Sequence, residues 1–446
     1  MRKDEMKDRR IGLADANNFF VSCERKYDES LIGRPVVVLS GNDGCIISRS
    51  NEVKHMGVKM GVPYYQVEKI LKYNGVAIRS ANHRMYQKIS SEVMRKINNY
   101  TDCMEYYSID ESFFNIGIPT VPDPVAYCRQ IREDVWRSCK IPISIAIAPT
   151  KTLAKLGSEI AKKSAEAQGV FWMDSLKYKN FAFMEQINCR DVWNIGPRMA
   201  NSLSLLGIRN AAQFVAKDDL WIKEKYGRPG LMTAWELRGF PVSIIADKRK
   251  PPQSIMVSRS FGETVTKFND VKDALLTFTV AAAAQLRRAQ LTAGRITVYL
   301  TTNRFAEDFY SNSKEHIYRD PASLDADFIH VAVSLLKDIF IEGREYKKCG
   351  VMLSDFVNVS LGRQTSLFAA ENDARRKAAM DAIDKINNEC GTPALKPAVL
   401  CETPEEEKKW LSKSSYRTEA TEKVIGKIKN TAPDGLRFQS KVDDYA

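Results

Sequence analysis

The sequence predicts a multidomain chain that mixes α/β and α+β folds, and three observations support this. Its 446 residues exceed what a single hydrophobic core holds. Residues 1–175 alternate strand-like runs with helix-like runs, whereas Phe181 to Pro241 are helical in composition with no clear strand. After a basic, proline-containing stretch, Lys248–Pro252, the expected order is β-α-β-β-α-β, a ferredoxin-like arrangement.

Apolar periodicity and turn residues place the elements of the first region. The Asp43-Gly44 step is typical of a hairpin turn, and one apolar stripe runs through Asn82 to Tyr100, as in an amphipathic helix. Thr150 is a suitable N-cap for a helix that follows it. The expected elements are strands at 10–15, 35–40, 45–48 and 141–148 and helices at 17–29, 51–56, 82–100 and 124–139.

The same patterns place the elements of the second region. We expect strands at 254–261, 295–302, about 315–318 and 349–356, with helices at 270–290 and 325–343. Beyond Phe356 the chain becomes polar. We expect a tail there that holds the short peptide Gln364–Phe368, a helix to about Cys390 and a charged end of low order.

The charge of the chain suggests a polyanionic partner. It has 67 Lys and Arg against 55 Asp and Glu, a net charge of +12. Nucleic acid is the better candidate because no basic amphipathic helix suggests a membrane surface. The absence of a signal peptide and of a long apolar run, with nine scattered cysteines and no Cys-x-x-Cys pair, predicts a cytoplasmic protein.

Three acids are the candidate catalytic residues. Asp110 and Glu111 are adjacent within the aromatic, β-branched run Tyr106–Asn115, and Asp15 ends the first predicted strand. A carboxylate beside a core must be paired or bound to metal. If the two segments are neighbouring strands of one sheet, the three acids converge. The alternative is a surface hairpin with two acids at its tip.

Three hard oxygen donors suit Mg²⁺. Two such ions about 3.5–4 Å apart would clamp the attacking and leaving oxygens of a phosphoryl transfer. The arrangement has one geometric requirement. Adjacent residues of a flat strand point to opposite faces, so Asp110 and Glu111 can share a site only where the strand bends or a hairpin ends.

Two further motifs suggest phosphate contacts. Lys151 and Lys155 share one face at the start of a helix, where a bound phosphate would offset their unfavourable position in the helix dipole. The stretch Asn194–Arg198, followed by Leu206-Gly207-Ile208, resembles a helix-hairpin-helix that holds a DNA phosphate at a helix start. The alternatives are a solvated lysine face and an ordinary helical corner.

The motifs together carry a family resemblance. Between Ile11 and Phe368 the chain resembles the Y-family translesion DNA polymerases, most closely their UmuC-like branch. Besides the first acidic strand, the matching motifs are "NDGCIISRSNEVKHMGVKMGVP", "YSIDES", "TKTLAKLGSEIAKK", "DVWNIGPR", "SRSFGE" and "QTSLF". Their order and spacing together make the resemblance specific.

The resemblance assigns roles to individual residues. It implies catalysis by Asp15, Asp110 and Glu111, which with the Ala16 carbonyl would hold two Mg²⁺ ions. Phe20 would be a steric gate, because a ring against the sugar leaves no room for a 2′-hydroxyl. The remaining implied contacts are Arg49, Lys54 and Lys155 for the nucleotide, Gly196, Arg198 and Arg259 for DNA, and Gln364, Leu367 and Phe368 for a sliding clamp.

The resemblance also implies an architecture and partners. The expected right-hand polymerase has a palm with fingers (1–175, fingers about 20–80), a thumb (176–246), a basic linker (247–254), a little finger (255–357) and a tail (358–446). The implied reaction is error-prone, templated DNA synthesis without proofreading. Primer-template DNA, a dNTP, the sliding clamp, UmuD′ and RecA are the implied partners.

Other functions compete with this one. A catalytically silent DNA-binding or regulatory homologue would have lost an acid, whereas all three acids are present. A nuclease using the same ions would degrade DNA without dNTPs. Within the family, a polymerase IV-like enzyme is the alternative, and the long tail beyond Phe368 argues against it.

Overall fold

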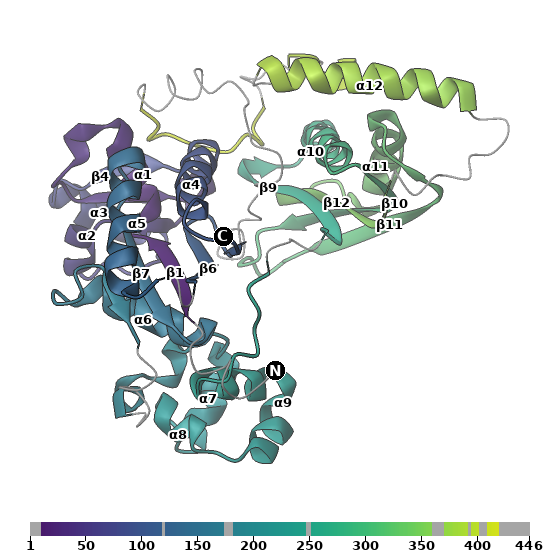
Figure 1. Cartoon of the computed structure of the whole chain (residues 1–446). Helices are drawn as coiled ribbons and strands as arrows, with labels where there is room; N and C mark the ends of the chain where they lie inside the picture. Colours follow the sequence, from purple (N-terminus) through teal and green to yellow (C-terminus); the bar gives the residue numbers. More distant parts are fainter. Residues whose placement is uncertain are drawn as a thin grey trace.

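The protein is represented by a computed structural model that describes residues 10–117, 121–173, 182–246, 251–358, 370–390, 394–400 and 408–418. Figure 1 shows an N-terminal region of strands and helices, a helical region around α7 to α9, and a second sheet region that includes β9 to β12. In the part of the chain that the structure describes, every helix is too short or too polar to cross a bilayer.

A five-stranded sheet forms the centre of the N-terminal region. Its order is β5 (Met104–Tyr106), β6 (Glu111–Asn115), β1 (Ile11–Ala16), β7 (Ile143–Ala148) and β8 (Val170–Trp172). Only the β7–β8 pair is parallel. Strand β1 is buried along its whole length because both faces of the sheet are covered.

Helices pack on the two faces of this sheet. Helices α4 (His83–Asn98) and α5 (Pro124–Cys139), with α1 (Phe19–Tyr27), cover the face that carries Ala14 and Ala16. Helix α6 (Lys151–Lys163) covers the face of Ile11 and Leu13, and Thr150 caps it as predicted, accepting a hydrogen bond from the Leu153 amide. Because side chains alternate along a strand, Asp15 shares the α6 face with Ile11 and Leu13.

Gly12 is required by the close packing in the centre of this sheet. It pairs with Phe114 across β1 and β6, and a Cβ added at Gly12 would lie 2.4 Å from the Phe114 ring. We therefore expect Gly12→Ala to cost about 1–3 kcal/mol of stability through overpacking. Thermal unfolding checks this against Gly41→Ala, where a Cβ meets nothing within 4 Å. Equal melting temperatures for the two variants would contradict the packing described.

A smaller sheet lies beside the first. Its order is β3 (Ile46–Arg49), β2 (Val36–Leu39) and β4 (Ala77–Ser80), with β2 and β4 parallel. Helices α2 (Asn51–His55) and α3 (Tyr64–Tyr73) belong to it, and its core is separate from that of the large sheet. The sequence patterns did not predict α3, β4 or β8. Between β2 and β3, the predicted hairpin turn is a short 3-10 helix, η2 (Gly41–Asp43).

The helical composition of the next region is confirmed for its described residues. Helices α7 (Pro197–Leu205) and α8 (Ala211–Val215) are joined through Gly207, whose φ of 77° is one that glycine adopts readily. Helix α9 (Asp219–Leu237) follows and is broken at Gly227. Further 3-10 turns lie at Glu29–Leu31, Ala182–Gln186, Cys189–Asp191 and Ala398–Leu400.

The predicted β-α-β-β-α-β order is confirmed in the last sheet region. Its elements are β9 (Ser254–Val265), α10 (Phe268–Arg288), β10 (Leu291–Thr302), β11 (Ser311–Ala322), α11 (Asp325–Ile339) and β12 (Tyr346–Asn358). The strand order is β11-β10-β12-β9, and all pairs are antiparallel. The tail helix α12 (Ala370–Cys390) packs on this region through ion pairs of Arg287 with Asp384 and of Arg376 with Asp327.

Candidate active site

The three candidate acids lie at neighbouring positions of the five-stranded sheet. Asp15, the penultimate residue of β1, is the register partner of Glu111, the first residue of β6. Asp110 immediately precedes β6, and its carbonyl accepts a 2.9 Å hydrogen bond from the Ala16 amide. The two predicted segments are therefore adjacent strands.

The requirement for a hairpin end is met at Asp110. The amides of Tyr107 and Ser108 both donate to the Glu111 carbonyl, at 3.1 and 3.0 Å, and close a tight turn. Asp110 belongs to this turn, and its Oδ1 accepts a 2.5 Å hydrogen bond from the Ser108 hydroxyl. Because the strand begins only at Glu111, strand alternation does not force Asp110 and Glu111 to opposite faces.

Helix α6 supplies amines to two of the acids. The Nζ of Lys162 lies 2.5 Å from Oδ2 of Asp15, and the Nζ of Lys155 lies 2.5 Å from Oε2 of Glu111. The sequence prediction missed Lys162. The signal was available, because Lys162 follows Lys155 by seven residues and so shares its helix face. Lys151, in contrast, pairs with Glu105 away from the acids.

Burial is the largest effect on the pKa values of two of the acids. Burial raises the pKa of Asp15 well above its ordinary value; the charge of Lys162 opposes this shift, and the charges of Glu111 and Asp110 add smaller increases. Burial, followed by the charge of Glu111, also raises the pKa of Asp110. The ionised forms of both carboxylates are therefore disfavoured at this site, a perturbation typical of functional sites.

The three carboxylates are of the ligand type that a hard divalent cation prefers, but in this structure each of them contacts another side chain. In the described ranges, no three His, Cys, Asp or Glu side chains form a ready set of metal ligands. Asp15 and Glu111 face lysines, and Asp110 faces Ser108. The side chains of Lys162 and Lys155 are 28% and 18% exposed, so either amine can swing outward when a cation takes its place.

A buried carboxylate that stays ionised lowers the free energy of unfolding. The raised pKa of Asp110 means that the folded chain binds this proton more tightly than the unfolded chain, so stability falls as pH rises above the ordinary Asp value. At pH 7.5 without divalent cations, we expect Asp110→Asn to stabilise the protein by about 1 kcal/mol. Thermal unfolding, with the exposed Asp102→Asn as control, measures this. A destabilised Asp110→Asn protein would contradict it.

Phe20 lies in the first turn of α1 and is 8% exposed. Its ring stacks on Tyr86 of α4, with centroids 4.6 Å apart and planes inclined by 18°. His83 contacts both rings edge-on. The Tyr86 hydroxyl donates a 2.5 Å hydrogen bond to the buried Glu24. These contacts fix the position of the Phe20 ring.

Two cations of the small-sheet region, Arg49 and Lys54, are within electrostatic range of each other. Partial burial lowers the pKa of Lys54 in α2, and the positive charges of Arg49 and Lys162 lower it further, whereas Asp15 acts in the opposite direction. Lys54 is therefore also within electrostatic range of the pair of Asp15 and Lys162. The buried Nε of Arg49, at the end of β3, has no hydrogen-bond partner among the described residues. A bound anion could use both groups.

The remaining predicted site residues do not lie at the three acids. Gly196 caps α7 and Arg198 is exposed in its first turn, in the helical region of Figure 1. Arg259 is exposed on β9, where its guanidinium donates to the Ser258 carbonyl at 2.6 Å. The structure brings none of the three to the acids. The clamp-peptide residues Gln364, Leu367 and Phe368 lie outside the described residues.

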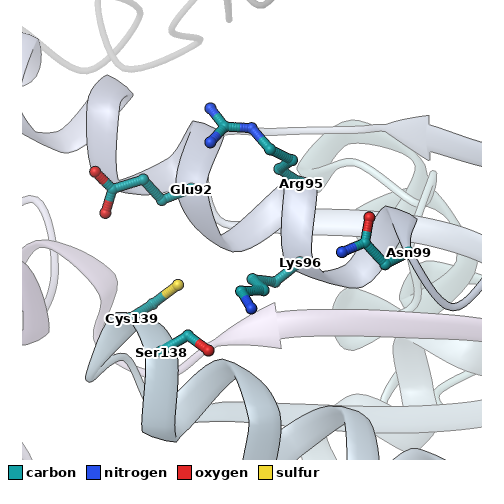
Figure 2. Close-up of a pocket in the computed structure, with 6 residues that line it drawn as sticks. All are labelled: Glu92, Arg95, Lys96, Asn99, Ser138 and Cys139. Atoms are coloured by element: carbon teal, nitrogen blue, oxygen red, sulfur yellow. The ribbon is translucent and has the colours of Figure 1, made fainter.

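A pocket of about 220 Å³ lies between the carboxyl ends of α4 and α5 (Figure 2). It contains none of the predicted site residues. Two of its charged lining residues have partners, because Glu92 pairs with Lys26 and Lys96 lies 3.9 Å from Asp134. The lining residues are Glu92, Arg95, Lys96, Asn99, Ser138 and Cys139.

Comparisons with known proteins agree with the fold. Residues 14–159 match the impB/mucB/samB family, and residues 252–367 match the C-terminal domain of that family. Protein UmuC of Salmonella typhimurium is 34% identical over 392 residues, which cover 86% of this chain and 92% of UmuC.

Two more distant relatives extend the comparison. DNA polymerase IV of Moorella thermoacetica is 26% identical over 87% of this chain and 95% of its own length. A solved Y-family DNA polymerase chimera of Dbh and Dpo4 has the same fold, with a TM-score of 0.64 at 20% identity, over 78% of this chain and 99% of the chimera. The identity to UmuC is higher than that to polymerase IV, which disfavours the polymerase IV-like alternative. The chain belongs to the impB/mucB/samB family, is similar to Protein UmuC over most of its length and has the fold of the Y-family DNA polymerases.

Proposed function

We propose that the chain performs translesion DNA synthesis at the site formed by Asp15, Asp110 and Glu111. The observation that carries this proposal is the β1–β6 register, which sets Asp15 opposite Glu111 beside an amine-bearing helix. In this proposal the acids hold two Mg²⁺ ions, with the Ala16 carbonyl as a further ligand. The bound ions would supply charge stabilisation to the attacking and leaving oxygens of nucleotidyl transfer.

The side chains around the acids bind and orient the nucleotide. Lys162, Lys54 and the unpartnered Nε of Arg49 would meet the triphosphate. Lys155 was assigned to the triphosphate from the sequence, and its pairing with Glu111 lets it serve instead to hold that carboxylate in place before the nucleotide arrives. Catalysis by such a set consists mainly of positioning and charge stabilisation.

Phe20 selects the sugar in this proposal. Because its ring is backed by Tyr86, it cannot retreat from a 2′-hydroxyl. We expect Phe20→Ala to lower the preference for dNTP over rNTP at least about 100-fold, since the clash with the hydroxyl disappears. Single-nucleotide extension with matched dNTP and rNTP measures the ratio, with Phe19→Ala as the neighbouring control. An unchanged ratio in Phe20→Ala would remove Phe20 from this role.

The sheets and the helical region support a division of the chain into domains. We infer that the palm with fingers spans 1–175, the fingers being the small sheet within about 20–80, and that the thumb spans 176–246. A linker at 247–254 leads to the little finger at 255–357, and the tail occupies 358–446. Primer-template DNA and a dNTP are the substrates proposed, and Gly196, Arg198 and Arg259 are proposed DNA contacts on thumb and little finger.

Further partners and the location of the protein are also proposals. The clamp peptide Gln364–Phe368, UmuD′ and RecA are proposed from the family relationship, as is a cytoplasmic location. Primer extension across a template lesion, with these partners supplied, tests the function. Templated extension past the lesion supports the proposal. Degradation of the primer without dNTPs would favour the nuclease alternative. The absence of both extension and degradation would favour a silent homologue.

A further inference from the structure

We propose that residues 408–418 form a strap that ties the fingers to the little finger. In Figure 1 this segment belongs to the yellow trace between the small sheet and the α10 side of the little finger. Its two ends contact different regions of the chain: one end is held by a buried tryptophan and a backbone hydrogen bond, and the other by several hydrogen bonds. The inference does not depend on the polymerase activity, because it rests only on contacts within the chain.

The first end of the strap is seated in the little finger. Trp410 is 6% exposed, and its ring meets Phe278 of α10 edge-on at 5.7 Å. The Lys409 carbonyl accepts a 3.2 Å hydrogen bond from the Glu263 amide on β9. A Cβ at Gly262 would lie 2.3 Å from the Leu411 carbonyl oxygen, so the strap can follow β9 here only because residue 262 has no side chain.

The second end of the strap is seated in the fingers. The amide of Tyr416 donates to the Ser80 hydroxyl at 3.0 Å, and the Tyr416 carbonyl accepts from the Ser80 amide at 3.4 Å, which adds a short strand-like contact beside β4. The Tyr416 hydroxyl lies 3.0 Å from that of Tyr64. The Ser415 amide donates to Oδ2 of Asp43 at 2.7 Å.

Asn42 joins the fingers, the strap and the little finger through one amide group. Its Nδ2 donates to the Ser260 carbonyl on β9 at 2.8 Å, and its Oδ1 accepts from the Lys413 amide at 2.9 Å. Asn42 and Asp43 both adopt left-handed backbone conformations, with φ of 58° and 52°. Asn and Asp tolerate this conformation better than most residues. Asn42 and Asp43 therefore suit both the backbone conformation of the turn and the hydrogen bonds that it makes.

The strap should therefore restrict movement between the two regions. An intact strap fixes the separation of the fingers and the little finger. Release of either end would let the little finger move while each region keeps its own core apart from the contacts of Trp410 or Tyr416. The strap is thus a conformational restraint that is formed by a segment of the chain itself.

Hydrogen exchange of the full-length chain tests the strap by changing one end and observing the other. Gly262→Ala blocks the little-finger end, and the amides of Ser415 and Tyr416 report on the fingers end. We expect their exchange to rise at least about tenfold in Gly262→Ala, because local opening becomes easier. Gly41→Ala, which adds a Cβ in open space, is the matched control and should exchange as the wild type does.

A second variant covers the case in which Gly262→Ala fails to fold. Asn42→Ala removes the shared amide from the fingers side, and the Glu263 amide then reports on the little-finger end, with the same increase expected. Small-angle scattering should show a larger radius of gyration for both variants. Wild-type exchange at Ser415 and Tyr416 as fast as in an unstructured peptide would overturn the proposal, as would unchanged exchange at the far end in the folded variants.

Discussion

Asp110→Ala is expected to abolish primer extension while leaving the fold intact. Asp110 lies in a turn outside β6, and the only side-chain hydrogen bond described for it is with Ser108, so its loss disturbs little packing. Removing one carboxylate from a cluster that holds catalytic cations costs several kcal/mol of transition-state stabilisation, or at least about a thousandfold in rate. Single-turnover nucleotide insertion at saturating dNTP measures the loss.

The controls for this prediction separate charge from shape. Asp102→Ala removes an exposed acid from the loop before β5 and should retain full activity. Asp110→Asn keeps the shape and the acceptor for Ser108 but not the charge, and should be as inactive as Asp110→Ala. Activity of Asp110→Asn near that of the wild type would show that the carboxylate charge is not needed, and the proposed site would be wrong.

Glu236→Ala is expected to be the most destabilising substitution at the joint between helix α6 and the helical region. Glu236 of α9 is 2% exposed, and its carboxylate accepts hydrogen bonds from three amides: Thr152 at 3.0 Å, Val242 at 3.0 Å and Ser243 at 2.8 Å. Each donor left buried and unpaired costs about 1–3 kcal/mol. We expect a total loss of about 3 kcal/mol or more, seen as a melting temperature lower by about 6 °C or more.

The effect should extend to the active site, because Thr152 lies in the first turn of the helix that carries Lys155 and Lys162. Glu224→Ala, at an exposed position of the same α9 helix, is the matched control and should unfold as the wild type does. A melting temperature for Glu236→Ala equal to that of Glu224→Ala would show that the carboxylate does not hold α6 and the helical region together.

Apolar patterns in the sequence identified the elements that are largely buried. Helix α4 and strands β1 and β7 have long buried runs, and their patterns placed them within a few residues. Strand β11 was predicted at about 315–318 but spans Ser311–Ala322. It is an edge strand with mostly exposed side chains, so no alternation marks its length, and only pairing with β10 defines it. Helix α3 was missed because three of its large apolar residues, Tyr65, Ile70 and Tyr73, are exposed.

Within the site, local sequence predicted the acids but not their partners. The two acidic segments could be recognised because carboxylates interrupt apolar runs. The pairing of Lys162 with Asp15 joins residues 147 positions apart, and the contact of Asn42 with Lys413 joins residues 371 apart. Such contacts depend on how sheets and domains pack, which no short pattern encodes. The strap carries one local hint, the isolated Trp410 in a polar tail.

The most direct measurement of the central claim is the position of Mn²⁺ in a crystal of the full chain with primer-template DNA and a non-hydrolysable dNTP. Anomalous scattering locates this ion, which prefers the same oxygen ligands as Mg²⁺. We predict peaks within about 2.0–2.3 Å of carboxylate oxygens of Asp15, Asp110 and Glu111, with Lys162 turned from Asp15 toward the triphosphate. Ions bound elsewhere, with Asp15 still paired to Lys162 and Glu111 to Lys155, would contradict the account.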